Sequence, residues 1–229
     1  MLTTVISGDI VASTSLSDEG RLFIEKKLKK IFKDLKKDFD VYGRIIKGDY
    51  IECVVPEPQN ALQVALAIKC FVKAITADNV LFNPSNNRTR NFNIYGIRLA
   101  IGYGDLTRFD AKKGIIDGEA IYLSGRTIGE FATYNKDRIV IKNTLYFASA
   151  NEKLNFEFEA LFALIDVLLS KATAKQCEVL YLKLMNFNEN EISKKLKIAQ
   201  SVVNQHSTSS GWNAIEKAVK YFSEVIKNQ

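Results

Sequence analysis

The chain has 229 residues and a formal net charge of +6, and 47% of its residues are hydrophobic and 25% charged. This balance is typical of a folded globular protein and excludes wholesale disorder, while the length suits one large domain or two unequal ones. The positive charge permits an anionic partner without identifying one, because many of the lysines fall on one predicted helix.

The cysteines and the hydrophobic runs bear on the cellular compartment. Cys53, Cys70 and Cys177 lie far apart in apolar segments, which predicts buried reduced thiols and argues against a disulfide or zinc framework. The chain enters a strand pattern at once, without a signal-peptide pattern, and no run approaches the ~18 apolar residues that a membrane-spanning helix needs. We therefore expect a cytoplasmic protein without a membrane partner.

Two aspartates follow apolar strand patterns near the start of the chain. Asp9 lies in VISGDIVAST, a run of small and β-branched residues, and Asp49 follows Gly48 where a second strand pattern breaks and resumes as a tight hairpin. Two carboxylates at adjacent strand ends can share Mg²⁺ or Mn²⁺, which commonly also binds phosphate oxygens. The alternative is that Asp9 caps the next helix and Asp49 simply occupies its turn. Between Ile10 and Ser17, hydroxyl side chains and free backbone N–H groups at a helix start would suit a phosphate.

The remaining elements alternate between strand and helix patterns as far as residue 141, which predicts an α+β fold with a ferredoxin-like sheet and its helices on one face. From about Leu154 the pattern is helical, which places a domain boundary within residues 142–153 and gives domains of residues 1–150 and 151–229. The predicted elements are helices at 19–39, 61–75 and 118–133, strands at 97–103, 114–117 and 138–141, and a mobile loop at 78–93.

The C-terminal helices carry clear start signals. Thr173 to Gln176 and Asn188 to Glu191 both have capping-box spacing. Residues 173–206 resemble the helix-turn-helix of LuxR-type regulators and of the promoter-reading domain of sigma factors. The resemblance implies that double-stranded DNA is a partner. The residues that it places against bases are Gln200, Ser201, Asn204 and Gln205, and those left for phosphates are Lys194, Lys195 and Lys197.

The predicted helix that carries these base contacts has no Arg or Lys, so we expect weak DNA binding that depends on a homodimer. The alternative for this segment is a helical bundle used for dimerisation or protein contact.

Residues 3–141 resemble the class III nucleotidyl cyclase fold, most closely the bacterial SatD-like proteins, through Ser7–Ser13 (SGDIVAS) and the Ile101–Gly104 strand (IGYG). The resemblance places Asp9 and Asp49 on the metal positions and Arg126, within a G-x-x-V-N-x-A-x-R-like segment, on the transition-state arginine. Its predicted nucleotide contacts are Ser13, Thr14 and Lys47.

Three departures argue against ordinary purine cyclisation. Tyr122 stands where the family has a ribose-binding Asn, Ile45 where it has a purine-selecting Lys, and Ile115 near the position of that lysine's acidic partner.

Three candidate functions therefore remain for the chain. The first is a DNA-binding transcriptional regulator whose cyclase-like domain dimerises and senses a nucleotide. The second is a metal-dependent enzyme acting on a nucleotide with a regulatory tail, and the third is a structural module.

Overall fold

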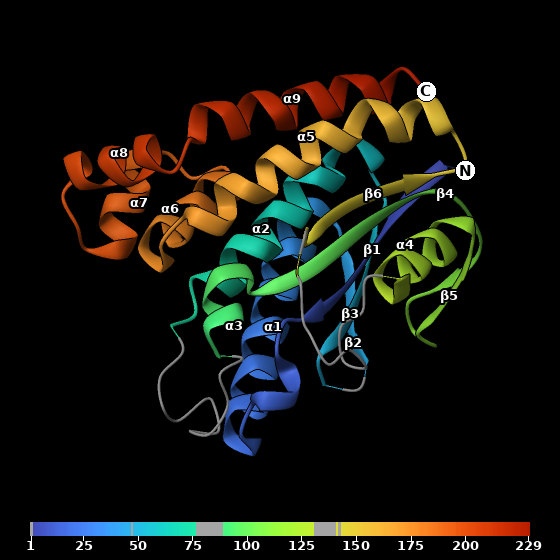
Figure 1. Cartoon of the computed structure of the whole chain (residues 1–229), viewed down its shortest axis with the longest axis horizontal. Coiled ribbons are helices and arrows are strands. Elements are labelled where there is room, and N and C mark those ends of the chain that lie inside the picture. The colour runs from blue at the N-terminus through green and yellow to red at the C-terminus, as the bar shows by residue number, and fades with distance from the viewer. Residues whose placement is uncertain (1, 47, 77–88, 131–140, 142) are drawn as a thin grey trace.

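The computed structural model describes residues 2–46, 48–76, 89–130, 141 and 143–229. Within these residues one mixed sheet is flanked by helices, and a group of helices extends from one end (Figure 1). The strands are β1 (Leu2–Ile10), β2 (Tyr42–Ile46), β3 (Tyr50–Val55), β4 (Ile97–Asp110), β5 (Ile115–Gly118) and β6 (Leu145–Ser149). The helices are α1 (Asp18–Phe39), α2 (Ala61–Lys73), α3 (Thr89–Tyr95), α4 (Glu119–Glu130), α5 (Glu152–Lys171), α6 (Ala174–Leu184), α7 (Glu189–Leu196), α8 (Gln200–Ser209) and α9 (Trp212–Lys227), with short 3₁₀ turns η1 (Ser13–Ser15) and η2 (Pro58–Asn60).

The sheet has the strand order β2-β3-β1-β4, with every neighbouring pair antiparallel. β6 pairs in parallel with β4, and β5 pairs with the far end of β4. The predicted mixed α+β class is confirmed. The register places Asp9 of β1 opposite Tyr50 on one side and Arg98 on the other, so the strand order itself assembles the surroundings of Asp9.

The two faces of the sheet are covered by different helices. Ile6 and Cys53 face a large apolar cluster that includes α1, α2, α5, α6 and α9, whereas Val5 and Val54 face α4 through Ala120. At Gly102 a Cβ atom would lie 2.1 Å from the Ala120 carbonyl oxygen, so α4 rests directly on the backbone of β4. The prediction that the helices lie on one face is therefore wrong for α4, because strand alternation gives this sheet two apolar faces.

Three local predictions differ from the structure. Residues 89–93 of the predicted loop are the start of α3, which is held by the buried side chain of Phe92 despite its unremarkable sequence pattern. Residues 78–88 of that loop lie outside the described residues, as do residues 138–140 of the predicted last strand. The strand that is described, β6, instead falls within the segment 142–153 that was predicted to be a boundary.

Helices α5 and α9 complete the core of the sheet. They lie side by side (Figure 1), and Phe158 of α5 is 4.8 Å from Phe222 of α9 and 5.0 Å from Phe147 of β6 between ring centroids. One contiguous cluster joins Ile6 to Ile226. The division into domains at residue 150 stays a prediction, and the apolar packing is continuous across it.

The helices α6, α7 and α8 surround a second small cluster. Its buried members are Val179, Leu182, Ile192 and Val203. Both predicted capping boxes are confirmed, at Thr173 and at Asn188. All three cysteines are buried and free, as predicted. No helix in the described ranges is long and apolar enough to cross a membrane.

Candidate functional site

The ends of β1 and of the β2–β3 hairpin form a polar corner. β1 ends at Ile10, and Ala12 takes a left-handed conformation (φ 60°) that turns the chain into η1. Gly48 also has a positive φ (80°), which lets the hairpin turn tightly before Asp49. The Ile10 N–H donates to the Asp49 carbonyl oxygen at 3.0 Å. This backbone bond holds the two predicted aspartates at the same end of the sheet.

Asp9 is a partly buried carboxylate with incomplete hydrogen bonding. Its Oδ1 atom lies 3.6 Å from Arg98 Nε, and this oxygen is buried and accepts no hydrogen bond in the described structure. Burial raises the pKa of Asp9 to about 6; the Arg98 charge opposes this rise and the Asp49 charge adds to it. Asp9 therefore titrates at about pH 6, well above an ordinary aspartate.

Asp49 is held by a hydroxyl from the turn after β1. Ser13 Oγ donates to Asp49 Oδ2 at 2.6 Å, and Thr14 is exposed next to it. Ser15 Oγ is buried and has no hydrogen-bond partner in the described structure. The third predicted nucleotide contact, Lys47, lies outside the described residues. The structure thus brings together Asp9, Asp49 and Ser13.

The structure limits one expectation about this turn and overturns another. The N–H groups of Ile10, Val11, Ser15 and Leu16 are bonded to backbone carbonyls, so these four are not free for a phosphate, and phosphate binding at the rest of the turn stays a prediction. Asp9 is not the cap of the following helix either, because the Ser17 side chain accepts from the Gly20 N–H at the start of α1. The capping role at α1 is taken by Ser17, a serine nearer to the helix.

The corner fits a hard divalent cation only in part. It offers two carboxylates and a hydroxyl, and the described part of the chain holds no cluster of three or more His, Cys, Asp or Glu that could bind a metal. Mg²⁺ and Mn²⁺ complete their coordination with water and phosphate oxygens when a protein supplies one or two carboxylates. The unbonded Asp9 Oδ1 fits such a ligand role, with phosphate as the further donor.

Arg98 lies beside Asp9 in this corner, and Tyr146 of β6 is influenced by the charges of both residues; neither Arg98 nor Tyr146 was predicted. Tyr146 donates to the Asn143 carbonyl at 2.6 Å, and its pKa is raised to about 12, mainly by burial; the Arg98 charge lowers it and the charges of Asp166 and Asp9 raise it further. Arg98 carries a charge between two apolar residues of a strand pattern. That pattern predicts a buried cation in need of a partner, but it does not identify Asp9.

Arg126 lies on the exposed side of α4. A Cβ atom on the preceding residue, Gly125, would lie 3.7 Å from the hydroxyl oxygen of Tyr50, the strand neighbour of Asp9. The Arg126 side chain itself is exposed, one turn after Tyr122, which donates to Asp117 at 2.6 Å. This part of α4 therefore borders the corner, while the Arg126 guanidinium faces solvent.

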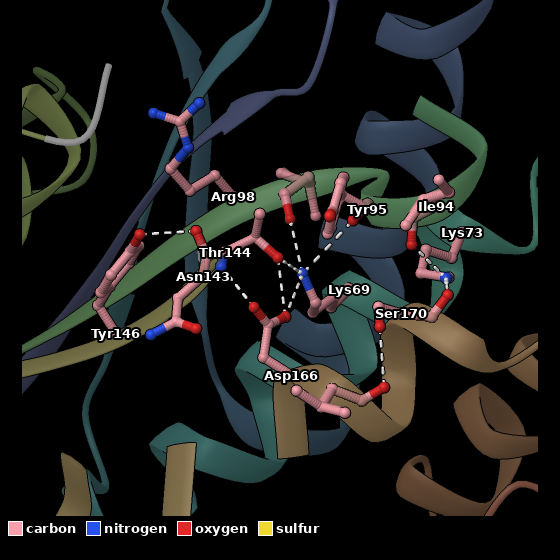
Figure 2. Close-up of polar contacts among 12 residues, drawn as sticks. Lys69, Lys73, Ile94, Tyr95, Arg98, Asn143, Thr144, Tyr146, Asp166 and Ser170 are labelled. Atoms are coloured by element: carbon pink, nitrogen blue, oxygen red, sulfur yellow. Dashed lines mark hydrogen bonds and ion pairs between the residues drawn. The ribbon is translucent and has the colours of Figure 1, made fainter. Parts of the chain in front are cut away.

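A second polar cluster lies on the other side of β4 and is fully buried (Figure 2). Lys69 Nζ donates to the Ile97 carbonyl at 3.0 Å and to Thr144 Oγ1 at 2.6 Å, and it lies 3.2 Å from Asp166 Oδ1. Thr144 donates to Asp166 through both its hydroxyl and its N–H. Figure 2 shows the Arg98 guanidinium directed away from this cluster. The Lys69 cluster links α2, α5 and the start of β6, and its contacts indicate a structural role.

In the tail, α7 and α8 are joined by a three-residue turn in which Lys197 is left-handed (φ 55°). Val203 of α8 is buried against α6 and α7. The predicted base contacts are all exposed, and they are Gln200, Ser201, Asn204 and Gln205. The predicted phosphate contacts Lys194, Lys195 and Lys197 are exposed as well.

Two contacts in the tail were not predicted. Glu189 accepts a hydrogen bond from Lys183 at 3.0 Å, which makes the largest contribution to lowering the pKa of Glu189, and the side chains of Gln200 and Asn204 lower that pKa further. Lys195 Nζ lies 4.5 Å from the centroid of the Phe187 ring. The acidic residue Glu189 therefore lies beside two of the four predicted base contacts, and Lys195, one of the three predicted phosphate contacts, packs on an aromatic ring.

Comparisons with known proteins give a weak structural likeness. No protein-family model and no curated protein matches the chain. Two solved structures of a bacterial light-regulated adenylyl cyclase are similar, with TM-scores of 0.45 and 0.44 and sequence identities of 12% and 14%. Each match covers 64% of this chain and 43% of the cyclase chain, so it spans less than half of that protein. A likeness of this size identifies no activity, substrate or partner for this chain.

Proposed function

We propose that the protein is a DNA-binding regulator in which α7 and α8 form a helix-turn-helix and the Asp9 corner binds a phosphate-bearing ligand with a divalent cation. The observation that carries the proposal is the two-sidedness of α8. Val203 and Ser207 are buried, while Ser201, Asn204 and Gln205 are exposed along the opposite side. A short helix with such a polar outer face, supported by a packed inner face, suits insertion into the major groove.

The packing around α8 supports this reading. A three-residue turn between two short helices is the connection that helix-turn-helix motifs use. The buried residues Ile192 and Val203 pack α8 against α7 and α6. This packing fixes the orientation of the exposed face of α8. Amide side chains can bind adenine in two places, and hydroxyls serve several bases.

The charges around α8 predict weak and sequence-dependent binding. Lys194 and Lys197 are exposed and available for phosphates, whereas Glu189 places a negative charge beside Gln200 and Asn204. Its carboxylate orients these amides, and it also repels the DNA backbone. Few phosphate contacts give low affinity for any single site. A two-fold dimer bound to two half-sites compensates for this, which is why we also propose a homodimer through the N-terminal part.

Selection of bound sequences from random duplex DNA tests the proposal, with and without nucleotide. We expect Asn204→Ala with Gln205→Ala to change which sequences are bound. Lys194→Ala with Lys197→Ala should weaken all sequences alike and reduce the salt dependence. Lys217→Ala with Lys220→Ala on α9 is the matched control and should leave DNA binding unchanged. The assignment of α8 is wrong if the lysine pair alters sequence preference and the amides do not.

Light scattering with and without DNA tests the dimer separately. A particle of twice the chain mass at micromolar concentration supports it, and a monomer under both conditions overturns it. The two tests are independent, because a monomer that selects sequences would retain the helix-turn-helix and lose only the dimer.

The second candidate function is a metal-dependent enzyme acting on a nucleotide. It is favoured by the buried, unbonded oxygen of Asp9 beside Asp49. Calorimetry with Mn²⁺ and a panel of nucleotides, on the parent and on Asp49→Asn, tests whether the corner binds at all. Turnover of any nucleotide that is lost in Asp49→Asn would favour the enzyme. Binding without turnover would favour a sensor, and equal heats for the two proteins would exclude both roles for the corner.

A further inference from the structure

A groove of about 670 Å³ lies where α1 and α2 meet α6 and α7. Its size is within the range of small-molecule sites. Its lining combines the aromatic residues Phe23, Phe71 and Tyr181 with three basic residues, Lys27 and Lys30 of α1 and Lys195 of α7. We propose that this groove binds a small organic anion, with an aromatic or aliphatic body against the aromatic residues and one acidic group among the lysines.

The aromatic lining of the groove is held in place by contacts within the protein. The rings of Phe71 and Tyr181 meet edge to face with centroids 5.0 Å apart. The Tyr181 hydroxyl donates to Asp34 Oδ2 at 3.0 Å, which fixes the ring between α6 and α1. A ligand would therefore meet a preformed apolar surface and would lose little affinity to ordering it.

Among the residues that the structure describes, the three lysines of the groove carry charges without an ion-pair partner. Lys27 Nζ lies 5.1 Å from the Phe23 ring centroid, and Lys195 Nζ lies over Phe187. In the described part of the chain no carboxylate forms an ion pair with Lys27, Lys30 or Lys195.

Two glutamates also line the groove. Of these, Glu178 is already bound by Lys175 at 3.0 Å. That pair leaves Glu19 as the acidic residue facing three lysines. The surplus of positive charge at an apolar surface selects a ligand that combines a hydrophobic body with a negative group.

The position of the groove gives the ligand a structural effect. Its walls come from the helix that follows the Asp9 corner and from the helix that precedes α8. A bound anion would contact both parts of the chain at once and would stabilise their packed arrangement by mass action. The inference does not depend on DNA binding or on a metal at Asp9, because the groove and its charges exist whatever those sites do.

The anionic dye 1-anilinonaphthalene-8-sulfonate is a suitable probe, and N-phenyl-1-naphthylamine is its uncharged counterpart. In fluorescence titrations of the full chain we expect one saturable site with at least about fivefold tighter binding of the sulfonate, since ion pairing at a partly exposed site contributes about that factor. Lys27→Gln with Lys30→Gln should remove this difference and leave binding of the neutral dye unchanged.

The controls separate the groove from general dye binding. Lys36→Gln with Lys37→Gln makes the same change of charge on the same helix outside the groove and should have no effect. Ala74→Trp fills the groove and should abolish binding of both dyes, with circular dichroism confirming the fold. The proposal is overturned if the neutral dye binds as tightly as the sulfonate, or if the two lysine pairs behave alike. Unchanged dye binding in a folded Ala74→Trp variant would overturn it too, and if that variant does not fold, the lysine pairs decide alone.

Discussion

Two carboxylates, Asp166 and Asp9, face cations on opposite sides of β4, and they differ in burial and in how completely their hydrogen bonds are formed. Asp166 lies 3.2 Å from Lys69 and also accepts two hydrogen bonds from Thr144, so the charges at this cluster are well satisfied. Asp9 lies 3.6 Å from Arg98, and one of its oxygens accepts no hydrogen bond. The Lys69–Asp166 pair is removed from water, and of Asp9 the Oδ1 atom is buried although its side chain is 19% exposed. A buried polar atom that lacks a hydrogen bond costs stability.

The difference separates a structural ion pair from a candidate binding site. At Asp166, hydrogen bonds offset the cost of burying charge, and nothing remains for a ligand to add. At Asp9 the cost of burying charge is only partly offset, and this remaining cost raises the pKa of Asp9 to about 6. Perturbed carboxylates of this kind gather at functional sites. The comparison can be tested by measuring what each group contributes to stability.

The largest effect is expected at Asp166. Asp166→Ala leaves the Lys69 ammonium buried without its counter-charge, and we expect the free energy of unfolding to fall by about 3–5 kcal/mol. Urea denaturation followed by circular dichroism measures the change. Lys69→Met with Asp166→Leu removes both charges and should recover most of the loss. A single variant as stable as the parent would show that the pair does not hold α5 to α2.

At Asp9 we expect the opposite result, because removing the charge of this carboxylate should raise the free energy of unfolding. The folded pKa of about 6 lies above the ordinary 3.8, so the folded state holds this proton more tightly and the parent loses stability as the pH rises from about 4 to 6. A rise of about 2 in the pKa corresponds to roughly 3 kcal/mol. Asp9→Asn, which cannot ionise, should therefore be more stable than the parent by up to about 3 kcal/mol at pH 8.

The pH dependence supplies the control for Asp9. The advantage of Asp9→Asn should shrink below pH 6 and vanish below about pH 3, where the parent carboxyl is protonated in both the folded and the unfolded state. Urea denaturation at a series of pH values measures it for both proteins. A variant that is less stable than the parent at pH 8 would mean that the Arg98 contact outweighs the burial of the charge, and the contrast with Asp166 would fail.

Thr144 should contribute an intermediate amount. Its hydroxyl accepts from Lys69 and donates to Asp166 at the centre of the buried cluster. Thr144→Val keeps the shape and removes both bonds, and we expect a loss of roughly 2 kcal/mol. Thermal unfolding monitored by calorimetry is the measurement. A loss below a few tenths of a kcal/mol would show that Lys69 and Asp166 are sufficient without the hydroxyl.

Ser13 provides the matched hydroxyl in the corner and the smallest effect. It donates to Asp49 at 2.6 Å, but both side chains are only half-buried. Water can replace the bond in Ser13→Ala, so we expect a loss of at most about 1 kcal/mol in the same calorimetric assay. A loss larger than that of Thr144→Val would show that the Ser13–Asp49 bond contributes more to stability than the bonds of Thr144. That result would contradict the structural role assigned to the Lys69 cluster.

The parts of the fold that sequence predicted are those set by local patterns. Alternating strands and a glycine break located Asp9 and Asp49 at neighbouring strand ends, and capping-box spacing located the starts of α6 and α7. These features depend on residues a few positions apart, where propensity and hydrogen bonding act directly. The exposed face of α8 follows from helical spacing in the same way, while its DNA partner stays a prediction.

The parts that sequence missed depend on pairing between distant segments. Lys69 and Asp166 each stand alone in an apolar helix pattern, which signals a buried charge but not its partner. Arg98 reaches Asp9 only because β4 lies next to β1. Likewise β6 is too short to be recognised without β4 beside it and Phe158 above it. The sheet order decides these contacts, and no local signal specifies it.

The apolar cluster that joins Ile6 of β1 to Ile226 of α9 has a consequence for the rate of folding. Contacts between segments so far apart in the chain form only after a large loop has closed, which costs entropy before any burial repays it. The β2–β3 hairpin and the capped helices α6 and α7 can form early because their contacts are local. The face of the sheet that carries Ile6 is covered completely only after α5 and α9 have packed against it. We therefore expect this packing step to limit the rate at which the chain reaches its native state.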